Sequence, residues 1–251
     1  MPQVDFRSPR LFVEAPLVEG GVVALDRDQA NYLGNVLRLR TGDTVLVFNG
    51  IEGEWLTAIE GAKRADRLRV QTRTRPQQPL ADLTYAFAPL KAARLDYMVQ
   101  KAVEMGTGSL QPVVTRFTQV GRVNLERMRA NVIEAAEQCG ILALATVGDP
   151  VPLQRWLASR DPQRLLVFCD EAAPVADPIA ALSGQRRGRG GIDVLIGPEG
   201  GFADEERALL MRQPRVLTLS LGPRILRADT AAVAALALVQ GVLGDWAGAD
   251  G

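Results

Sequence analysis

The chain has 251 residues, enough for one large domain or two small ones that each bury a core. Basic and acidic side chains number 29 each, so no overall charge indicates a polyanionic partner, and a nucleic-acid surface would have to be a local patch. The sequence contains no histidine, which excludes His-dependent catalytic triads and His-ligated zinc.

The sequence also indicates where in the cell the protein is expected. No stretch approaches the roughly 20 apolar residues of a membrane-spanning helix, and the first residues lack the apolar core of a signal peptide. We therefore expect a cytoplasmic protein. Cys139 and Cys169 do not have metal-binding spacing, and we expect small buried thiols in preference to a disulfide.

The first third of the chain is predicted to form a small barrel, because short apolar runs alternate with turn residues. The expected strands are residues 10–13, 21–25, 44–49, 54–59 and 68–74. Apolar residues with helical spacing predict one helix over residues 28–39. Arg38 and Arg40 lie at and just beyond its end.

The strongest local charge bias is a basic stripe at residues 63–75, with six basic residues and one acidic residue. Such a run is typical of the solvated face of a strand. It is also typical of a face that contacts phosphates. Both interpretations stay open at this point.

Residues 76–79, with two prolines, are the predicted linker. Beyond it, strand-like runs alternate with helical segments, which indicates an α/β domain with a largely parallel sheet. The expected strands are residues 83–88, 110–115, 164–169, 192–196 and 216–221. We therefore predict two domains, residues 1–75 and residues 76–251.

Four helices are predicted in the second domain. The first covers residues 94–105, and the second begins near Asn124. The third runs from acidic to basic residues directly after GPEGGF, and the alanine-rich fourth covers residues 229–246. Lys91 and Arg94 belong to a basic face of the first helix. Residues 184–191 are predicted to be a basic loop.

Two predicted strands of this domain end in glycine-rich turns, within IDVLIGPEGGF and VLTLSLGPRILRADTA. Glycine removes side chains where the backbone bends or approaches a ligand closely. The two turns are therefore either a site for a small molecule or ordinary connections between strands and helices.

Taken together, the motifs NYLGNVLRLRTGD, LKAARLDYMVQKAVEMG, EAAEQCG, LIGPEGGF and LSLGPRILRADTA resemble those of the bacterial small-subunit ribosomal RNA (uracil-N3)-methyltransferases of the SPOUT superfamily. The resemblance covers nearly the whole chain. It implies a PUA-like RNA-binding barrel at residues 1–75 and, at residues 76–251, an α/β methyltransferase domain with a parallel sheet and a C-terminal trefoil knot.

The resemblance implies that the knot binds S-adenosylmethionine. The cofactor-binding residues that it indicates are Cys169, Gly197, Glu199, Gly200, Gly201, Leu219, Leu221, Gly222, Ile225 and Leu226, with Asp170 beside Cys169. No metal is expected, because a sulfonium methyl donor is already activated.

The uridine nitrogen becomes a good nucleophile only when it loses its proton. Arg227 is the first candidate to stabilise the developing anion electrostatically, and Arg224 is the candidate to bind a nearby phosphate. Glu137 or Asp229 is the candidate base. The alternative for Arg227 is a salt bridge to Asp229 or Glu199 that only holds the two loops together.

The same resemblance implies that ribosomal RNA binds both domains, while a homodimer forms through the C-terminal region. The predicted RNA-binding residues are Arg38, Arg40, Arg67, Arg69, Lys91, Arg94 and Arg224. Ala228 and Asp229 stand where the family commonly has Thr and Glu. Methylation of another RNA site, or a non-catalytic RNA-binding protein of the same fold, therefore remains an alternative.

Overall fold

The computed structural model describes residues 5, 7–61, 66–174, 177–185 and 190–247. The chain divides into two compact units: unit 1 is Met1–Leu80 with Ile133–Leu144, and unit 2 is Ala81–Val132 with Ala145–Gly251. Some predicted basic residues lie outside the described residues, namely Lys63, Arg64, Arg186, Arg187 and Arg189.

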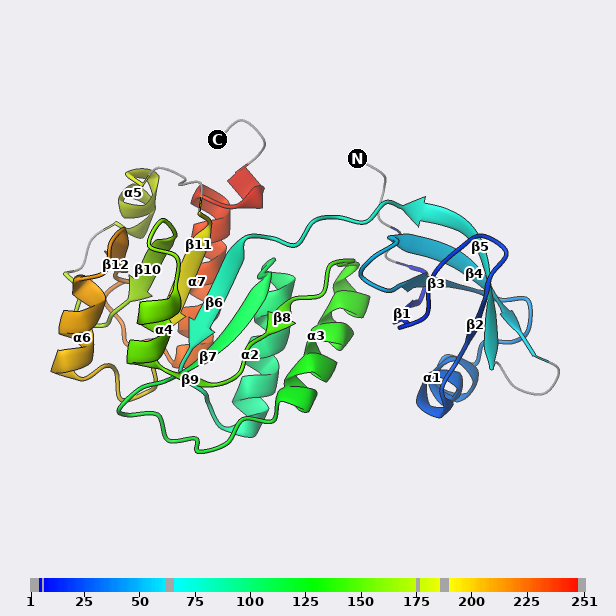
Figure 1. Ribbon diagram of the computed structural model, residues 1–251, viewed down its shortest axis with the longest axis horizontal. Coiled ribbons are helices and arrows are strands. Elements are labelled where there is room, and N and C mark those ends of the chain that lie inside the picture. The colour runs from blue at the N-terminus through cyan, green and yellow to red at the C-terminus, as the bar shows by residue number, and fades with distance from the viewer. Residues whose placement is uncertain (1–4, 6, 62–65, 175–176, 186–189, 248–251) are drawn as a thin grey trace. The chain divides into compact units, whose positions relative to one another are not determined.

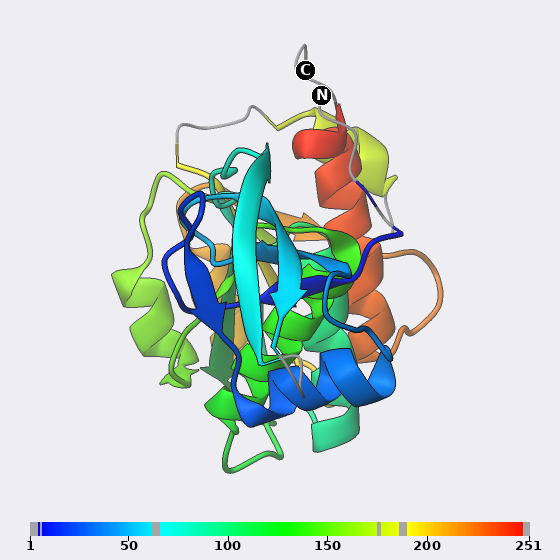
Figure 2. The same ribbon diagram turned by 90° about the vertical axis from the view of Figure 1, so that its right-hand side faces the viewer.

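A five-stranded sheet forms most of unit 1, in the order β1-β3-β4-β5-β2. Its strands are β1 (Arg10–Phe12), β2 (Val22–Ala24), β3 (Thr44–Phe48), β4 (Glu54–Glu60) and β5 (Arg67–Arg75). Only β1 and β3 pair in parallel, and Figure 2 shows the two longest strands, in cyan, side by side. All five predicted strands are present with small shifts at their ends.

The larger apolar cluster of unit 1 lies on one face of this sheet. Val45 and Val47 of β3 and Leu68 and Val70 of β5 are almost completely buried in one apolar cluster. These residues alternate with more exposed ones along β5, and successive side chains of a strand point to opposite faces. The alternation therefore gives β5 one buried face, whereas β3 is buried on both faces, since Phe48 packs in a second cluster with Ala136 and Leu142.

The predicted helix of the first third is two shorter pieces, which corrects its expected length. The α-helix α1 (Arg27–Asn31) begins with a capping box between Asp26 and Gln29, and a π-helical turn η1 (Tyr32–Val36) follows it. Arg38 has a positive φ of 57°. A left-handed residue cannot continue a right-handed helix, so the segment ends there.

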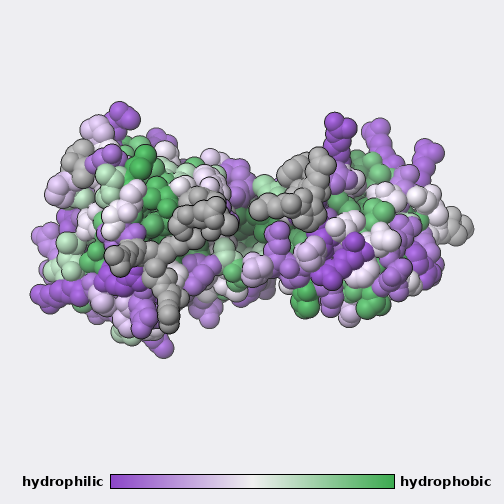
Figure 3. Space-filling model, turned by 90° about the horizontal axis from the view of Figure 1, so that it is seen from above, coloured by the Kyte–Doolittle hydropathy of each residue, from purple (hydrophilic) through white to green (hydrophobic). Residues whose placement is uncertain are grey.

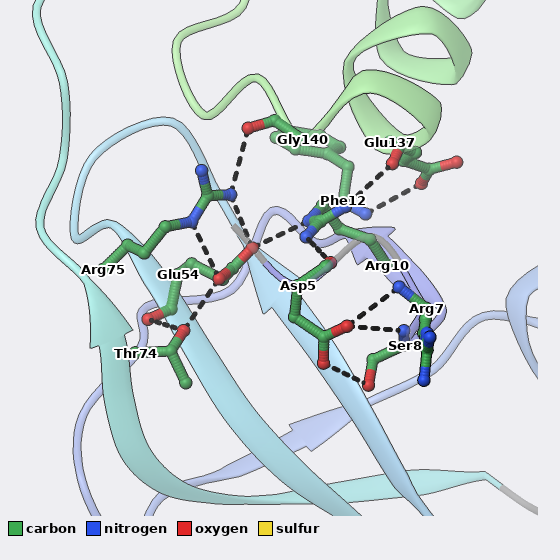
Figure 4. A network of polar contacts seen from close by, with 10 residues as sticks. All are labelled: Asp5, Arg7, Ser8, Arg10, Phe12, Glu54, Thr74, Arg75, Glu137 and Gly140. Carbon is green, nitrogen blue, oxygen red and sulfur yellow. Dashed lines mark hydrogen bonds and ion pairs between the residues drawn. The ribbon is translucent and has the colours of Figure 1, made fainter. Parts of the chain in front are cut away.

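A buried polar network in unit 1 was not predicted (Figure 4). The Glu54 carboxylate accepts hydrogen bonds from Arg10 Nε at 2.7 Å and from Arg75 Nε at 2.9 Å. The two guanidinium groups also donate to the carbonyl oxygens of Glu137 and Gly140, at the end of helix α3 (Leu125–Cys139). Cations stabilise the carboxyl end of a helix, so the network fixes this helix end to the barrel.

Unit 2 contains a parallel sheet in the order β12-β10-β11-β6-β7-β8, as the alternating pattern predicts. The strands are β6 (Leu83–Phe87), β7 (Ser109–Val114), β8 (Thr146–Val147), β10 (Leu165–Cys169), β11 (Ile192–Ile196) and β12 (Val216–Leu219), and β9 (Val151–Pro152) pairs with β7. The short strands β8 and β9 were not predicted, because two residues are too few to show a period.

Helices cover both faces of this sheet (Figure 1). The helices are α2 (Ala92–Glu104), α4 (Leu153–Ser159), α5 (Pro178–Ser183), α6 (Asp204–Met211) and α7 (Ala228–Val242), while α3 begins in unit 2 and continues into unit 1 from Ile133. Ala86 and Leu195 pack in one cluster with residues of α4 and α6, whereas the neighbouring Tyr85 lies on the other face, where its hydroxyl contacts Met98 of α2. Strands buried on both faces explain the nearly continuous apolar runs of the sequence.

Several helix ends differ from the predictions. The short helices α4 and α5 were not predicted, and α7 covers Ala228–Val242 in place of residues 229–246. Asn124 does cap α3, since its side chain accepts a hydrogen bond from Arg127 N. None of the described helices is both long and apolar enough to cross a bilayer. In the view of Figure 3, hydrophilic residues cover much of the surface of each unit.

Candidate active site

A cavity of about 320 Å³ opens in unit 2 where β10, β11 and β12 end. These three strands are neighbours in the sheet, and ligands of open α/β sheets bind outside the carboxyl ends of the strands. The lining residues are Cys169, Asp170, Glu171, Ile196, Gly197, Pro198, Glu199, Gly201, Phe202, Leu219, Ser220, Leu221, Gly222, Pro223, Arg224, Ile225, Leu226, Arg227, Ala228 and Ala231.

The loop after β11 needs its glycines for steric reasons. A Cβ atom at Gly197 would lie 2.5 Å from the ring of Phe202, and that ring packs edge-on against Phe168 in the core. Gly201 has a φ of 70°, which favours glycine, and its N–H donates to Pro198 O at 2.9 Å. The loop therefore turns tightly at the edge of the cavity, which Gly197 and Gly201 line.

The loop after β12 forms a second wall and leads into α7. Gly222, with a φ of 100°, makes the turn. Arg224, Ile225 and Arg227 are exposed around it, and Ile225 is 86% exposed. Two cations on a short exposed loop give this side of the cavity a positive potential, which suits an anionic ligand or transition state.

The end of β10 and the residues after it form the third wall of the cavity. Burial raises the pKa of the Cys169 thiol from 9.0 to about 12, so this group stays protonated at neutral pH. The next residue, Asp170, is 8% exposed and accepts two hydrogen bonds of 2.8 Å from the Arg207 guanidinium of α6. This bidentate ion pair joins the β10 loop to the helix that follows the glycine loop.

The structure brings together almost all of the residues predicted to bind the cofactor. Nine of the ten line the cavity; Gly200 is outside the lining and packs against Phe117, whose Cβ would be 3.2 Å from an added Cβ. Sequence reasoning missed several lining residues, namely Glu171, Ile196, Pro198, Phe202, Ser220, Pro223, Ala228 and Ala231. Most of these are direct sequence neighbours of predicted residues, so extending each motif by one position would have found them.

The alternative ion pairs of Arg227 are not formed among the residues that the structure describes. Glu199 pairs with Arg94 instead, at 3.2 Å, and the Asp229 carboxylate accepts a hydrogen bond from Thr230 N. Arg227 therefore lines the cavity as an exposed cation. Asp229 is in the first turn of α7, outside the lining residues.

Glu137, the other candidate base, belongs to unit 1. Burial raises the pKa of its carboxyl group. The hydrogen bond from Phe12 N lowers this pKa, and the charge of Glu134 raises it further. The Phe12 N–H donates to Glu137 Oε1 at 2.8 Å. This contact gives the Glu137 side chain a structural role in the barrel.

The predicted RNA-binding residues have varied surroundings. Arg69 donates two hydrogen bonds to the Glu60 carboxylate, while Arg67 lies 3.5 Å from Asp66. Lys91 is exposed at the start of α2. Arg38 is the left-handed residue after η1, and Arg40 N donates to Asp43. The basic stripe is thus partly neutralised, and its last residue, Arg75, is buried.

Comparisons with known proteins agree with this architecture. Residues 76–240 match the RNA methyltransferase domain family, and residues 25–70 match the RNA methyltransferase PUA domain family. The ribosomal RNA small subunit methyltransferase E of Rickettsia conorii is 31% identical over 92% of this chain and 94% of its own length. The Synechocystis protein of the same name is 30% identical over 93% of this chain and 78% of its own length.

Two solved structures show the same fold with a ligand. The ribosomal RNA small subunit methyltransferase E of Neisseria gonorrhoeae, bound to S-adenosylmethionine, superposes with a TM-score of 0.83 at 26% identity and covers 96% of this chain and 100% of that one. A Legionella pneumophila methyltransferase with the same bound cofactor gives 0.80 at 28% identity, covering 94% and 98%. The chain belongs to the family of the ribosomal RNA small subunit methyltransferases E, in which a PUA domain precedes an RNA methyltransferase domain.

Proposed function

We propose that the protein transfers the methyl group of S-adenosylmethionine to N3 of a uridine in small-subunit (16S) ribosomal RNA. The observation that carries this proposal is the cavity between the glycine loop after β11 and the loop after β12, the two segments with the most specific sequence motifs. Both segments are in the part of the chain that matches the RNA methyltransferase domain.

The cavity suits a nucleoside ligand with a charged tail. Its glycines leave backbone N–H and C=O groups open to an adenine ring, and a Cβ at Gly197 would displace Phe202. The residues that would hold the cofactor are the nine predicted residues that line the cavity, namely Cys169, Gly197, Glu199, Gly201, Leu219, Leu221, Gly222, Ile225 and Leu226. S-adenosylmethionine supplies a methyl group activated by its sulfonium charge.

The chain's own residues would favour the uridine anion. Arg227 stabilises the negative charge that develops when N3 loses its proton, because an exposed guanidinium beside the cavity has no competing carboxylate partner among the described residues. Arg224, three residues earlier on the same loop, binds a neighbouring phosphate. Asp229 and Glu137 remain the candidate bases.

The proposal divides the work between two domains. Residues 1–75 hold RNA phosphates through Arg38, Arg40, Arg67 and Arg69. Residues 76–251 accept the splayed-out uridine, with Lys91 and Arg94 at the RNA-facing side of α2. The C-terminal trefoil knot, the homodimer and the cytoplasmic location stay predictions that rest on the family resemblance and on the sequence.

The test is methyl transfer from labelled S-adenosylmethionine to small ribosomal subunits from cells that lack this protein, followed by mapping of the modified nucleotide. Label on N3 of one uridine is the expected result. Label on another atom or nucleotide would support the alternative of a different RNA site. Cofactor binding without transfer to subunits or free ribosomal RNA would indicate another RNA substrate, and loss of both would favour a non-catalytic RNA-binding protein.

One substitution tests the role of Arg227. Arg227→Ala is expected to abolish methyl transfer while the affinity for S-adenosylmethionine changes by only a few-fold, since the guanidinium acts on the acceptor. Arg155→Ala, which removes an exposed arginine of α4 outside the cavity lining, is the matched control. Near-normal turnover of Arg227→Ala would remove this residue from the mechanism.

A further inference from the structure

Acidic and basic side chains line different walls of the cavity. Three lining carboxylates, those of Asp170, Glu171 and Glu199, follow β10 and β11, and two lining arginines, Arg224 and Arg227, follow β12. A cationic group is therefore favoured on one side of the cavity and an anionic group on the other.

Two of the three carboxylates already have cationic partners. Asp170 binds the Arg207 guanidinium through two hydrogen bonds of 2.8 Å. Glu199 lies 3.2 Å from Arg94 Nη1. A carboxylate that a guanidinium neutralises contributes little further attraction for a second cation.

The surroundings of Glu171 differ from those of Asp170 and Glu199. Its side chain is exposed and, within the described part of the chain, has neither a hydrogen bond nor an ion pair. Its carboxylate oxygen would lie 3.1 Å from a Cβ at Gly201, so it lies beside the glycine loop. The pKa of Arg207 is raised first by its side-chain hydrogen bond to Asp170, and the charge of Glu171 is the last of its causes, so Arg207 binds Asp170 and acts on Glu171 only through space.

We infer that Glu171 is a specificity-determining residue that selects the positively charged methyl donor over its demethylated product. The inference rests on the proposed function. S-adenosylmethionine and S-adenosylhomocysteine share the adenosine and the amino-acid group, but only the donor has a sulfonium charge. An unpaired carboxylate beside the cavity therefore stabilises the donor complex more than the product complex and favours product release.

The experiment compares the dissociation constants of both ligands by isothermal titration calorimetry. Glu171→Gln keeps the size of the side chain and removes its charge. We expect it to reduce the preference for S-adenosylmethionine over S-adenosylhomocysteine by roughly fivefold, the effect of one partly screened charge. Glu171→Asp should keep most of the preference. Glu205→Gln, at an exposed carboxylate of α6 outside the lining, should leave it unchanged.

An unchanged preference in Glu171→Gln, with both ligands still bound, would overturn this inference and leave the proposed function intact. So would an equal loss of affinity for both ligands, because it would place Glu171 against a group that they share. A wild-type protein that binds neither ligand would overturn the proposed function as well.

Discussion

The buried network around Glu54 makes a sharp prediction about stability. The Glu54 side chain is 2% exposed, and those of its partners Arg10 and Arg75 are 3% and 4% exposed. Glu54→Gln keeps the shape but leaves two buried guanidinium groups without their shared counter-charge. Breaking a buried pair in this way costs about 3–5 kcal/mol, a large part of the roughly 5–15 kcal/mol that stabilises a typical domain.

The same sheet provides a matched control. Glu60, at the other end of β4, pairs with Arg69 of β5 at 2.9 Å, but these side chains are 38% and 44% exposed. Solvent screens such a pair, so Glu60→Gln should cost much less stability than Glu54→Gln. The two variants remove the same group from the same strand and differ mainly in burial.

Urea unfolding followed by tryptophan fluorescence measures both costs. Trp55 is the only tryptophan of unit 1, so replacing Trp156 and Trp246 with Phe in every variant makes the signal report on that unit. If Glu54→Gln destabilised the protein by no more than Glu60→Gln, the buried network would not be the main electrostatic contribution to unit 1.

The pH dependence of stability provides a second test of the same network. Burial alone would raise the pKa of Glu54, but the hydrogen bonds from Arg75, Arg10 and Thr74 outweigh it, so the folded pKa is lowered. A lowered pKa means that the carboxylate contributes stability above its unfolded value of about 4.3 and that this contribution is lost as the pH falls through the folded pKa. The difference between wild type and Glu54→Gln should therefore shrink below about pH 4.

Two further predictions concern the cavity. Gly197→Ala should destabilise unit 2 by about 1–3 kcal/mol and weaken S-adenosylmethionine binding at least roughly tenfold, because its Cβ would lie 2.5 Å from the Phe202 ring. Calorimetry would measure both effects. Gly241→Ala is the control, because an added Cβ there has no atom within 4 Å. With its thiol pKa near 12, Cys169 should resist iodoacetamide at pH 8 while the exposed Cys139 reacts, and equal labelling of the two in mass spectrometry would contradict the buried thiol.

The sequence alone determined the features that depend on near neighbours. Strand β11 has the predicted bounds Ile192–Ile196, and the glycine pattern of the two loops indicated Gly197, Gly201 and Gly222, which line the cavity. Apolar runs, turn residues and glycines act within a few positions of themselves, so their pattern can be read from the chain. The π-helical turn η1 was missed, because its apolar spacing also suits an α-helix.

Only the tertiary structure decided which charges meet. Arg94 pairs with Glu199, which is 105 positions away and was one of the two partners that the sequence offered Arg227. The Arg75 guanidinium reaches Gly140 at the end of α3, 65 positions away, and Arg207 binds Asp170, 37 positions away, through two hydrogen bonds. A long-range ion pair depends on strand order, register and burial, and a single sequence does not encode these in any local pattern.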